Sequence, residues 1–364
     1  MTPLERLAAE PEEVRRKRGT LHTPGEILQQ PWLWRDTAGR VAAVRDRAES
    51  ALTGAAFAVL AGAGSSLHAA RLAEDAARAR LGAEVACVSC TDLLLAPEAR
   101  LRRGAKGVLL SLSRSGESPE AVEASRVAAE RFPNVVQIAV TCNAESALAR
   151  LVNAQPHGLC IALHPKSYDK GIGTTSSMTS TALAARLLFD AADVEPLARA
   201  GEAALAGAAG AEEAAAAKPG RVVVLGTGPL EAAAQEGAHK VLELTDGRVP
   251  TMARSCLEFR HGPIAFLDAS TLLVGLLSTA PLTRRYEDDF VAQARTMGVR
   301  RVETVAPPDG LDAGEAAILG VVWCQMLALF ISLGRGLAPD RPGSRSLVNP
   351  IVQGVTIHPR EVPR

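Results

Sequence analysis

Apolar and polar positions alternate in a fixed order along the first half of the chain. The apolar run 57–61 leads through a Gly-rich turn into a helical pattern over 67–80, and further apolar runs follow at 85–88, 107–112 and 135–141. Apolar runs of strand length separated by helical periodicity predict parallel strands joined by helical crossovers. We therefore expect a parallel sheet with helices on both faces.

The second half of the chain repeats this order. Its elements are strand 221–225, Gly-rich turn 226–229, helix 230–244, strand 272–278, helix 284–297 and strand 299–305. Two copies of one α/β unit explain the repetition, and an alanine-rich helix ending at Lys218-Pro219-Gly220 separates them. We predict an N-terminal helical arm over residues 1–50, a first domain over 51–200 and a second domain over 201–364.

Composition narrows the class of protein. The chain has 364 residues, enough for two domains, and its 40 basic and 40 acidic residues give zero net charge, which argues against nucleic acid or a membrane surface as partner. Cys87 and Cys90 have no second pair at zinc-ligand spacing, so we expect free thiols and no metal site. The start of the chain lacks the apolar core of a secretory signal, and the apolar run 318–333 is too short to span a membrane. We expect a cytoplasmic protein.

The turn after the apolar run 107–112 carries the clearest chemistry. It reads SRSGES from Ser113 to Ser118, with Ser118 at the N-cap and Pro119 at the first position of a helix. Free backbone N–H groups and the positive end of the helix dipole favour a phosphate or another small anion here. An ordinary capped turn is the alternative interpretation. The second copy has STAPL at 278–282 in place of the first five residues of this turn and so lacks its other serines, so only the first copy should hold an anion.

Two other kinds of Gly-rich turn occur in the sequence. The stretch 170–177, KGIGTTSS, has the same hydroxyl-rich chemistry before a helix over 178–191. The turns 62–64 and 226–228 are G-x-G turns that lack the third glycine of a dinucleotide site, and the chain has no nucleotide-binding P-loop motif. The sequence therefore predicts an anion site without a nucleotide cofactor.

Candidate acid–base groups lie in the second half. Glu236, Lys240 and Glu243 share one face of a helix, which is typical either of a solvated ion-pair face or of a proton-transferring site. The apolar neighbours of Glu243 predict a buried edge, where desolvation would raise its pKa. His261 precedes Gly262-Pro263 in a loop, where it is either a proton carrier or a surface residue. No role is assigned to His68, His157, His164, His239 and His358.

Together these motifs resemble the sugar isomerase (SIS) family, and in particular its AgaS branch of galactosamine-6-phosphate deaminase/isomerases and tagatose-6-phosphate ketose/aldose isomerases. The motifs that carry the resemblance are GAGSS at 62–66, SRSGES at 113–118, KVLELT at 240–245 and HGP at 261–263. Features of the branch are YDKG at 168–171, FRHGP at 259–263 and VNPIVQGV at 348–355. The resemblance extends over nearly the whole chain.

The resemblance implies a fold and a set of roles. The fold is two tandem SIS domains, each a three-layer α/β/α sandwich of the flavodoxin type, after the helical arm. The phosphate-binding residues would be Ser65, Ser66, Ser113, Arg114, Ser115 and Ser118, and the sugar would be lined by Gly64, Thr174 and Ser176. Glu243 would move the proton between C2 and C1, Lys240 would lie beside the sugar hydroxyls, and His261 would assist ring opening from the partner subunit of a homodimer.

Two departures from the related glucosamine-6-phosphate synthase accompany these roles. Arg114 stands where the synthase has glutamine, and a guanidinium pairs well with phosphate. The synthase also has a lysine in its C-terminal tail that reaches the sugar, and Lys170 and Arg260 are the candidates to replace it here.

The resemblance implies an enzyme that opens an amino-hexose 6-phosphate, galactosamine or glucosamine 6-phosphate, and releases a ketose 6-phosphate and ammonia without cofactor or metal. One alternative is aldose–ketose isomerisation without loss of nitrogen. Another is a non-catalytic sugar-phosphate sensor. The lack of a basic DNA-reading segment before residue 55 and the presence of Glu243 and His261 disfavour the sensor.

Overall fold

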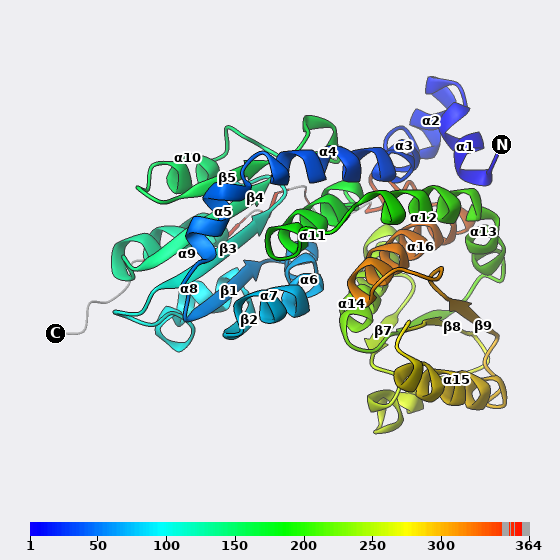
Figure 1. Cartoon of the computed structure of the whole chain (residues 1–364). Coiled ribbons are helices and arrows are strands. Elements are labelled where there is room, and N and C mark those ends of the chain that lie inside the picture. The colour runs from blue at the N-terminus through cyan, green and yellow to red at the C-terminus, as the bar shows by residue number, and fades with distance from the viewer. Residues whose placement is uncertain (344–348, 350, 353, 359–364) are drawn as a thin grey trace.

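The computed structural model describes residues 1–343, 349, 351–352 and 354–358. It contains two separate parallel sheets with helices around them, preceded by a helical arm (Figure 1). The predicted fold class, two α/β copies in tandem, is confirmed. Of the C-terminal tail motif, Val348, Pro350 and Gln353 lie outside the described residues.

The first sheet has five parallel strands in the order β2-β1-β3-β4-β5. The strands are β1 Phe57–Gly62, β2 Glu84–Ser89, β3 Gly107–Ser113, β4 Val135–Thr141 and β5 Leu159–Ala162. Every residue of the central strands β1 and β3 is buried, as expected where helices cover both faces. The fifth strand was not predicted, because its four residues belong to a short apolar run, 159–163, whose length alone does not separate a strand from a buried helix segment.

The second sheet has four parallel strands in the order β7-β6-β8-β9. The strands are β6 Arg221–Leu225, β7 Thr251–Arg254, β8 Thr271–Leu276 and β9 Arg301–Val305. The duplication is visible in the backbone, because Gly64 after β1 and Gly228 after β6 have nearly the same angles, φ 55°, ψ −129° and φ 63°, ψ −131°. The short strand β7 was not predicted.

The helices of the first sheet connect its strands in the expected crossovers. They are α6 Ser65–Leu72, α7 Glu74–Leu81, α8 Cys90–Leu95, α9 Pro119–Arg131 and α10 Ala147–Asn153, with a short 3-10 turn at Pro97–Ala99. The helix predicted over 67–80 starts two residues earlier and is broken at Ala73 into α6 and α7. All six cysteines are free thiols.

The N-terminal arm packs into the core. Its helices are α1 Pro3–Ala9, α2 Glu12–Arg18, α3 Thr23–Leu28, α4 Gln30–Ala42 and α5 Arg45–Leu52. Trp34 of α4 has no exposed surface, and its indole Nε1 donates to Oγ1 of Thr179 on α11 (Ser176–Phe189) at 3.1 Å. A buried aromatic with a satisfied N–H anchors the arm on the main body.

The remaining helices surround the second sheet. They are α12 Glu195–Ala206, α13 Ala208–Ala216, α14 Pro229–Leu244, α15 Pro281–Arg295 and α16 Ala313–Gly334, with 3-10 turns at Glu258–Arg260 and Pro263–Phe266. A further 3-10 turn, Pro165–Ser167, follows β5 of the first sheet. The C-terminal helix α16 is 22 residues long, which corrects the expectation of a run too short to cross a membrane. By length and composition it could cross one, but 89% of its apolar window is buried against neighbours that include α13 and α14.

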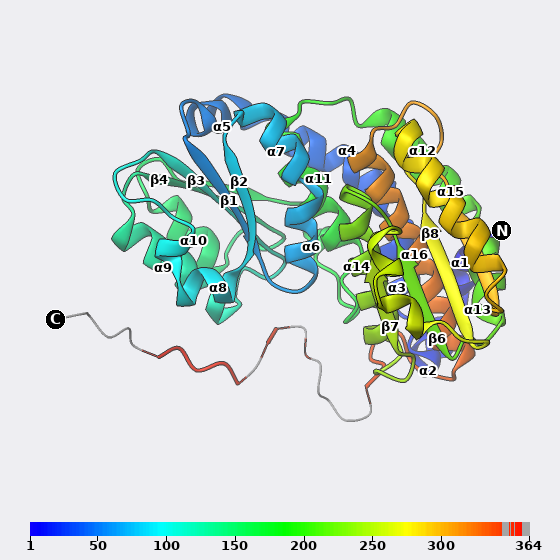
Figure 2. The same cartoon turned by 90° about the horizontal axis from the view of Figure 1, so that it is seen from below.

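The two units contact each other through helices α6 and α14. Helix α6 of the first unit and helix α14 of the second lie side by side between the sheets, and α11 packs on α6 as well (Figures 1 and 2). Side chains at the carboxyl edge of the first sheet therefore lie close to side chains of α14.

Candidate active site

The serine turn after β3 is tightly built. Ser113, Arg114 and Ser115 are each less than 10% exposed. The hydroxyl of Ser113 accepts from the backbone N–H of Gly116 at 3.0 Å, and the Ser115 hydroxyl accepts from Glu117 N–H at 3.2 Å. Helix α9 then begins as predicted, with Ser118 at the N-cap, but the Ser118 hydroxyl does not cap the helix. That hydroxyl is therefore not committed to the first turn of α9.

A second serine turn lies at the same edge of the sheet. Ser65 and Ser66 open α6 directly after β1, and both are half-buried. Strand β1 pairs with β3 in parallel, so the two serine turns follow the carboxyl ends of adjacent strands. In open α/β sheets this edge is where ligands bind.

The third hydroxyl-rich turn is already occupied by a carboxylate of the chain. Thr175, Ser176 and Ser177 each donate both a backbone N–H and a hydroxyl to the carboxylate of Asp169, which is 1% exposed. The Ser176 hydroxyl also accepts from Gln29 at 2.9 Å. Asp169 thus neutralises the N-terminus of α11, where the sequence indicated chemistry like that of the Ser113 turn.

Thr174 points elsewhere. Its Oγ1 lies 3.2 Å from Nζ of Lys240 on α14. Of the two hydroxyl residues expected to line the sugar, Thr174 is therefore beside the candidate catalytic helix, and Ser176 is bound to Asp169.

The equivalent turn of the second unit is also filled by an internal acid. Glu287 of α15 is fully buried, and its Oε2 accepts from the backbone N–H of Ser278 after β8 at 2.7 Å. Burial raises the pKa of this carboxyl, which the hydrogen bond from Ser278 partly offsets. This carboxylate supplies a physical reason for the expectation that only the first unit holds an anion.

The face of α14 carries a buried charge cluster rather than a solvated ion-pair face. Lys240 is fully buried. Its Nζ lies 2.5 Å from Oε2 of Glu243 and 3.5 Å from Oε1 of Glu236. Burial alone would lower the pKa of Lys240, but the two carboxylates outweigh burial and raise it. The Glu243 side chain is 13% exposed, at the buried edge that its apolar neighbours predict.

Histidines that the sequence left without a role join this cluster. Nδ1 of His68 on α6 is 2.7 Å from Oε2 of Glu236, and the ring of His239 meets that of His68 edge-on at 5.9 Å. Nε2 of His239 is 4.0 Å from Oε2 of Glu243. The only sequence signal for a role of His68 is its position one turn after Ser65. That position does not reveal that α6 packs against α14.

Two observations link the serine turns to the α14 cluster. The positive charge of Arg114, in the Ser113 turn, is among the influences that lower the pKa of Lys240. Helices α6 and α14 are antiparallel, because Arg71, one turn after His68, bonds to Gln235, one residue before Glu236. Moving back along α6 to Ser65 therefore leads toward Lys240 and Glu243.

His261 is separate from this cluster within one chain. It is exposed between two 3-10 turns, and among the described residues its ring forms no hydrogen bond or ion pair. Arg260 beside it is engaged with α15, since its Nε donates to Gln293 at 3.1 Å and its guanidinium lies over the Phe290 ring. Lys170 has an exposed side chain, and its backbone N–H binds Glu26.

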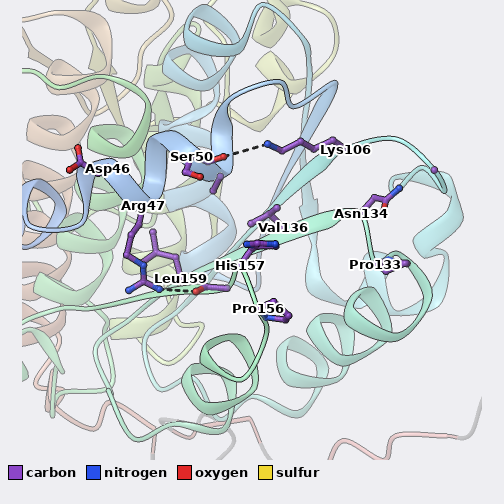
Figure 3. A pocket seen from close by; sticks show the side chains of 13 residues that line it. Asp46, Arg47, Ser50, Lys106, Pro133, Asn134, Val136, Pro156, His157 and Leu159 are labelled. Atoms are coloured by element: carbon purple, nitrogen blue, oxygen red, sulfur yellow. Dashed lines mark hydrogen bonds between the residues drawn. The ribbon is translucent and has the colours of Figure 1, made fainter.

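A cavity of about 820 Å³ opens at the amino edge of the first sheet, opposite the serine turns (Figure 3). Its basic side chains are held by backbone carbonyls: Arg47 donates to Gly158 and Lys106 to Ser50. The cavity contains none of the predicted site residues. Within the described part of the chain, no three His, Cys, Asp or Glu side chains gather as a metal site.

Comparisons with known proteins agree on the family. No family model matches the chain. An AgaS protein from Streptomyces coelicolor is 38% identical over 367 residues, covering 93% of this chain and 95% of the relative. The D-galactosamine-6-phosphate deaminase AgaS of Shewanella sp. (strain ANA-3) is 32% identical, covering 94% of this chain and 92% of its own. The tagatose-6-phosphate ketose/aldose isomerase of Escherichia coli superposes with a TM-score of 0.85 at 28% identity, over 93% and 97% of the two chains.

Proposed function

Because this chain belongs to the AgaS family of sugar isomerase (SIS) proteins, we propose that it converts an amino-hexose 6-phosphate into a ketose 6-phosphate and ammonia. Galactosamine 6-phosphate is the first candidate substrate, since curated relatives are named for it. The observation that carries the proposal is the buried Lys240–Glu243 pair of α14, held beside the serine turns at the carboxyl edge of the first sheet.

The serine turns would hold the phosphate. Neutral hydroxyls and backbone N–H groups at the starts of α6 and α9 suit an anion, and the guanidinium of Arg114 adds charge. The proposed phosphate ligands are Ser65, Ser66, Ser113, Arg114, Ser115 and Ser118. The two other hydroxyl-rich turns are filled by Asp169 and Glu287, which supports this choice of turns.

Glu243 would be the acid–base residue. In the open-chain sugar the C2 proton is acidic because the neighbouring C1 carbonyl takes up the electron pair. Glu243 takes this proton and returns it to C1, while the C1 oxygen takes up the proton that the C2 ammonium loses, so that the aldehyde becomes an alcohol and the C2 ammonium becomes an iminium. The ammonium of Lys240 lies against Thr174 and Glu243, where it can stabilise negative charge that develops on the sugar oxygens.

Ring opening would involve His261 of the partner subunit in a homodimer. Within one chain the exposed ring of His261 has no partner among the described residues, which supports a role across an interface. Sedimentation of the purified protein tests the dimer. We place the enzyme in the cytoplasm, where a neutral chain with free thiols fits a reducing environment.

The second candidate function is aldose–ketose isomerisation without loss of nitrogen, favoured by the similarity to the tagatose-6-phosphate ketose/aldose isomerase structure. One experiment separates the two. The protein is incubated separately with galactosamine 6-phosphate, glucosamine 6-phosphate and tagatose 6-phosphate, and ammonia and sugar-phosphate products are measured together. Galactosamine without phosphate is the control. Equal amounts of ammonia and ketose support the deaminase, whereas turnover of tagatose 6-phosphate with no ammonia from either hexosamine contradicts it.

A further inference from the structure

A second protonatable pair lies beside the Lys240–Glu243 pair and has no part in the steps above. His68 of α6 contacts Glu236 of α14 through Nδ1 and Oε2, 2.7 Å apart. The Glu236 side chain is completely buried, and 15% of the His68 side chain is accessible. The contact therefore joins the two units at a place that solvent or substrate reaches from the histidine side.

The charge on Glu236 decides which of the two atoms, Nδ1 of His68 or Oε2 of Glu236, carries the shared proton. Burial opposes that charge, but Lys240 and the hydrogen bond from His68 outweigh burial and hold the pKa of the carboxyl at about 2. An ionised carboxylate only accepts hydrogen bonds, so Nδ1 of His68 carries the proton that it donates. In the neutral ring Nε2 then has the free lone pair, and it forms no hydrogen bond among the described residues. A buried carboxylate fixes the tautomer of a catalytic histidine in the same way in serine hydrolases.

His68 also has the right position. It lies one turn after Ser65 on the same face of α6, and Glu236 lies one and two turns before Lys240 and Glu243 on the same face of α14. The antiparallel packing of these helices places Ser65 toward Lys240 and Glu243, and the imidazole of His68 one turn further along α6, against Glu236.

The neighbours of His68 do not replace it as a proton carrier. The titratable groups in contact with it are Glu236 and His239 of α14. Lys240 contacts Glu236 on the same helix, and Arg71 of α6 contacts Gln235. Burial and the charge of Lys240 lower the pKa of His239. Lys240 is committed to two carboxylates. The His239 side chain is more exposed than that of His68, 40% against 15%, but its Nε2 lies 4.0 Å from Oε2 of Glu243, so His68 is the ring that the buried carboxylate of Glu236 orients.

We propose that His68, oriented by Glu236, is the general base and then the general acid of the hydrolytic half of the reaction. This inference rests on the proposed deaminase function, in which Glu243 moves only the carbon-bound proton. Nε2 of His68 takes a proton from water as the water oxygen bonds to C2 of the iminium, and the C2–N π electrons go to nitrogen. The imidazolium returns that proton to the amine, and the C2–N bond breaks. The C2 hydroxyl proton passes to Nε2 and on to the released ammonia, so iminium and water become ketone and ammonium.

The experiment separates the two halves of the reaction in the full-length protein. In D₂O with galactosamine 6-phosphate, deuterium entering C2 of the remaining substrate reports the Glu243 step, and ammonia reports hydrolysis. His68→Asn keeps an amide nitrogen near the position of Nδ1, so it can still donate to Glu236, but it cannot carry a proton. We expect ammonia release to fall about 100-fold, as for loss of a general acid–base group, while C2 exchange stays within about threefold.

His157→Asn removes an imidazole from the cavity at the opposite edge of the sheet and is the matched control, expected to leave both rates unchanged. If exchange and ammonia release fall together in His68→Asn, or if neither falls, the proposed role is wrong. If circular dichroism shows that His68→Asn is not folded, the same two rates, ammonia release and C2 exchange, are measured and compared in His68→Gln. A wild-type protein that releases no ammonia contradicts the deaminase function itself, whereas normal ammonia release by a folded His68→Asn contradicts only the role of His68.

Discussion

Nζ of Lys240 and Oε2 of Glu243 lie 2.5 Å apart, one turn from each other on α14. The amine of Lys240 is fully buried and the carboxylate of Glu243 is partly accessible. The pair therefore exposes the carboxylate to the site and keeps the amine inside. The contact with Lys240 fixes the position of the Glu243 carboxylate, and with it the place where the proposed proton transfer occurs.

The first prediction concerns Glu243. In Glu243→Gln the amide keeps the size of the side chain but cannot accept a proton, so kcat for ammonia release should fall about 10²–10⁴-fold. Lys240 retains its contact with Glu236, so the unfolding midpoint in urea should change little. Glu231→Gln, in the first turn of the same helix, is the control with unchanged kcat. Full turnover by Glu243→Gln would show that another group moves the proton.

The second prediction concerns Asp169. Its carboxylate accepts six hydrogen bonds from the start of α11, and an asparagine offers one oxygen and turns an N–H₂ toward the remaining donors. Asp169→Asn should lower the free energy of unfolding by about 3 kcal/mol, measured in guanidinium chloride. Asp193→Asn changes an exposed carboxylate that accepts one hydrogen bond, from Glu195 N–H at the start of α12, and should cost less than about 1 kcal/mol. Equal, small losses in both variants would mean that the buried carboxylate is not needed.

The third prediction is a pH dependence at Glu26 of the N-terminal arm. Its carboxylate accepts from Lys170 and Gly171 N–H, and burial followed by the charge of Asp169 raises its pKa from 4.5 to about 8. The folded state therefore keeps a proton that the unfolded state loses above pH 4.5, so this group reduces stability as pH rises from about 4.5 to about 8.

Glu26→Gln removes that titration. Relative to wild type at each pH, the variant should be similar near pH 4.5 and should gain stability, by a few kcal/mol at most, as pH approaches 8.5. Thermal unfolding over this range measures the difference. A difference that does not change with pH would show that Glu26 is ionised in the folded protein throughout.

The fourth prediction tests the phosphate turn. The hydroxyl of Ser118 does not cap α9, so Ser118→Ala should leave the melting temperature nearly unchanged and raise KM for the sugar phosphate about tenfold, the loss of one hydrogen bond to a charged group. Thr2→Ala is the converse control: it removes the capping box of α1, so it should lower stability by about 1 kcal/mol and leave KM unchanged. An unchanged KM in Ser118→Ala would remove this residue from the proposed phosphate site.

The elements that could be predicted are those whose signal is local. The apolar runs of β1 and β3 and the Ser118-Pro119 helix start depend on neighbours in sequence, and they were found. Strands β5 and β7, each four residues long, become strands only by pairing with β4 and β6. The break of one predicted helix at Ala73 likewise depends on packing.

The candidate site divides in the same way. Lys240 and Glu243 were identified because both lie on one helix, where spacing alone places them together. The six bonds of Asp169 and the His68–Glu236 contact were not, because they join residues brought together only by the docking of separate elements. A hydroxyl-rich turn in a sequence does not reveal whether a distant carboxylate already fills it.

The last prediction concerns the shape of the serine turn. Gly116 has φ +63°, and a Cβ there would lie 2.2 Å from Oγ of Ser146. That hydroxyl cannot move freely, because it caps α10 by accepting from Ala149 N–H at 3.2 Å. Gly116→Ala should therefore distort the turn, raise KM for the sugar phosphate and destabilise the protein by about 3 kcal/mol, combining left-handed strain with a lost cap.

Gly54→Ala isolates the backbone part of this effect. Gly54 has a similar φ of +71°, but a Cβ there would meet no atom within 4 Å. This variant should lose only about 1–2 kcal/mol in urea unfolding and keep its KM. If the two alanine variants lose equal stability and neither changes KM, the close approach of Ser146 does not shape the phosphate turn. A larger loss and a raised KM in Gly116→Ala alone would tie the capped start of α10 to substrate binding.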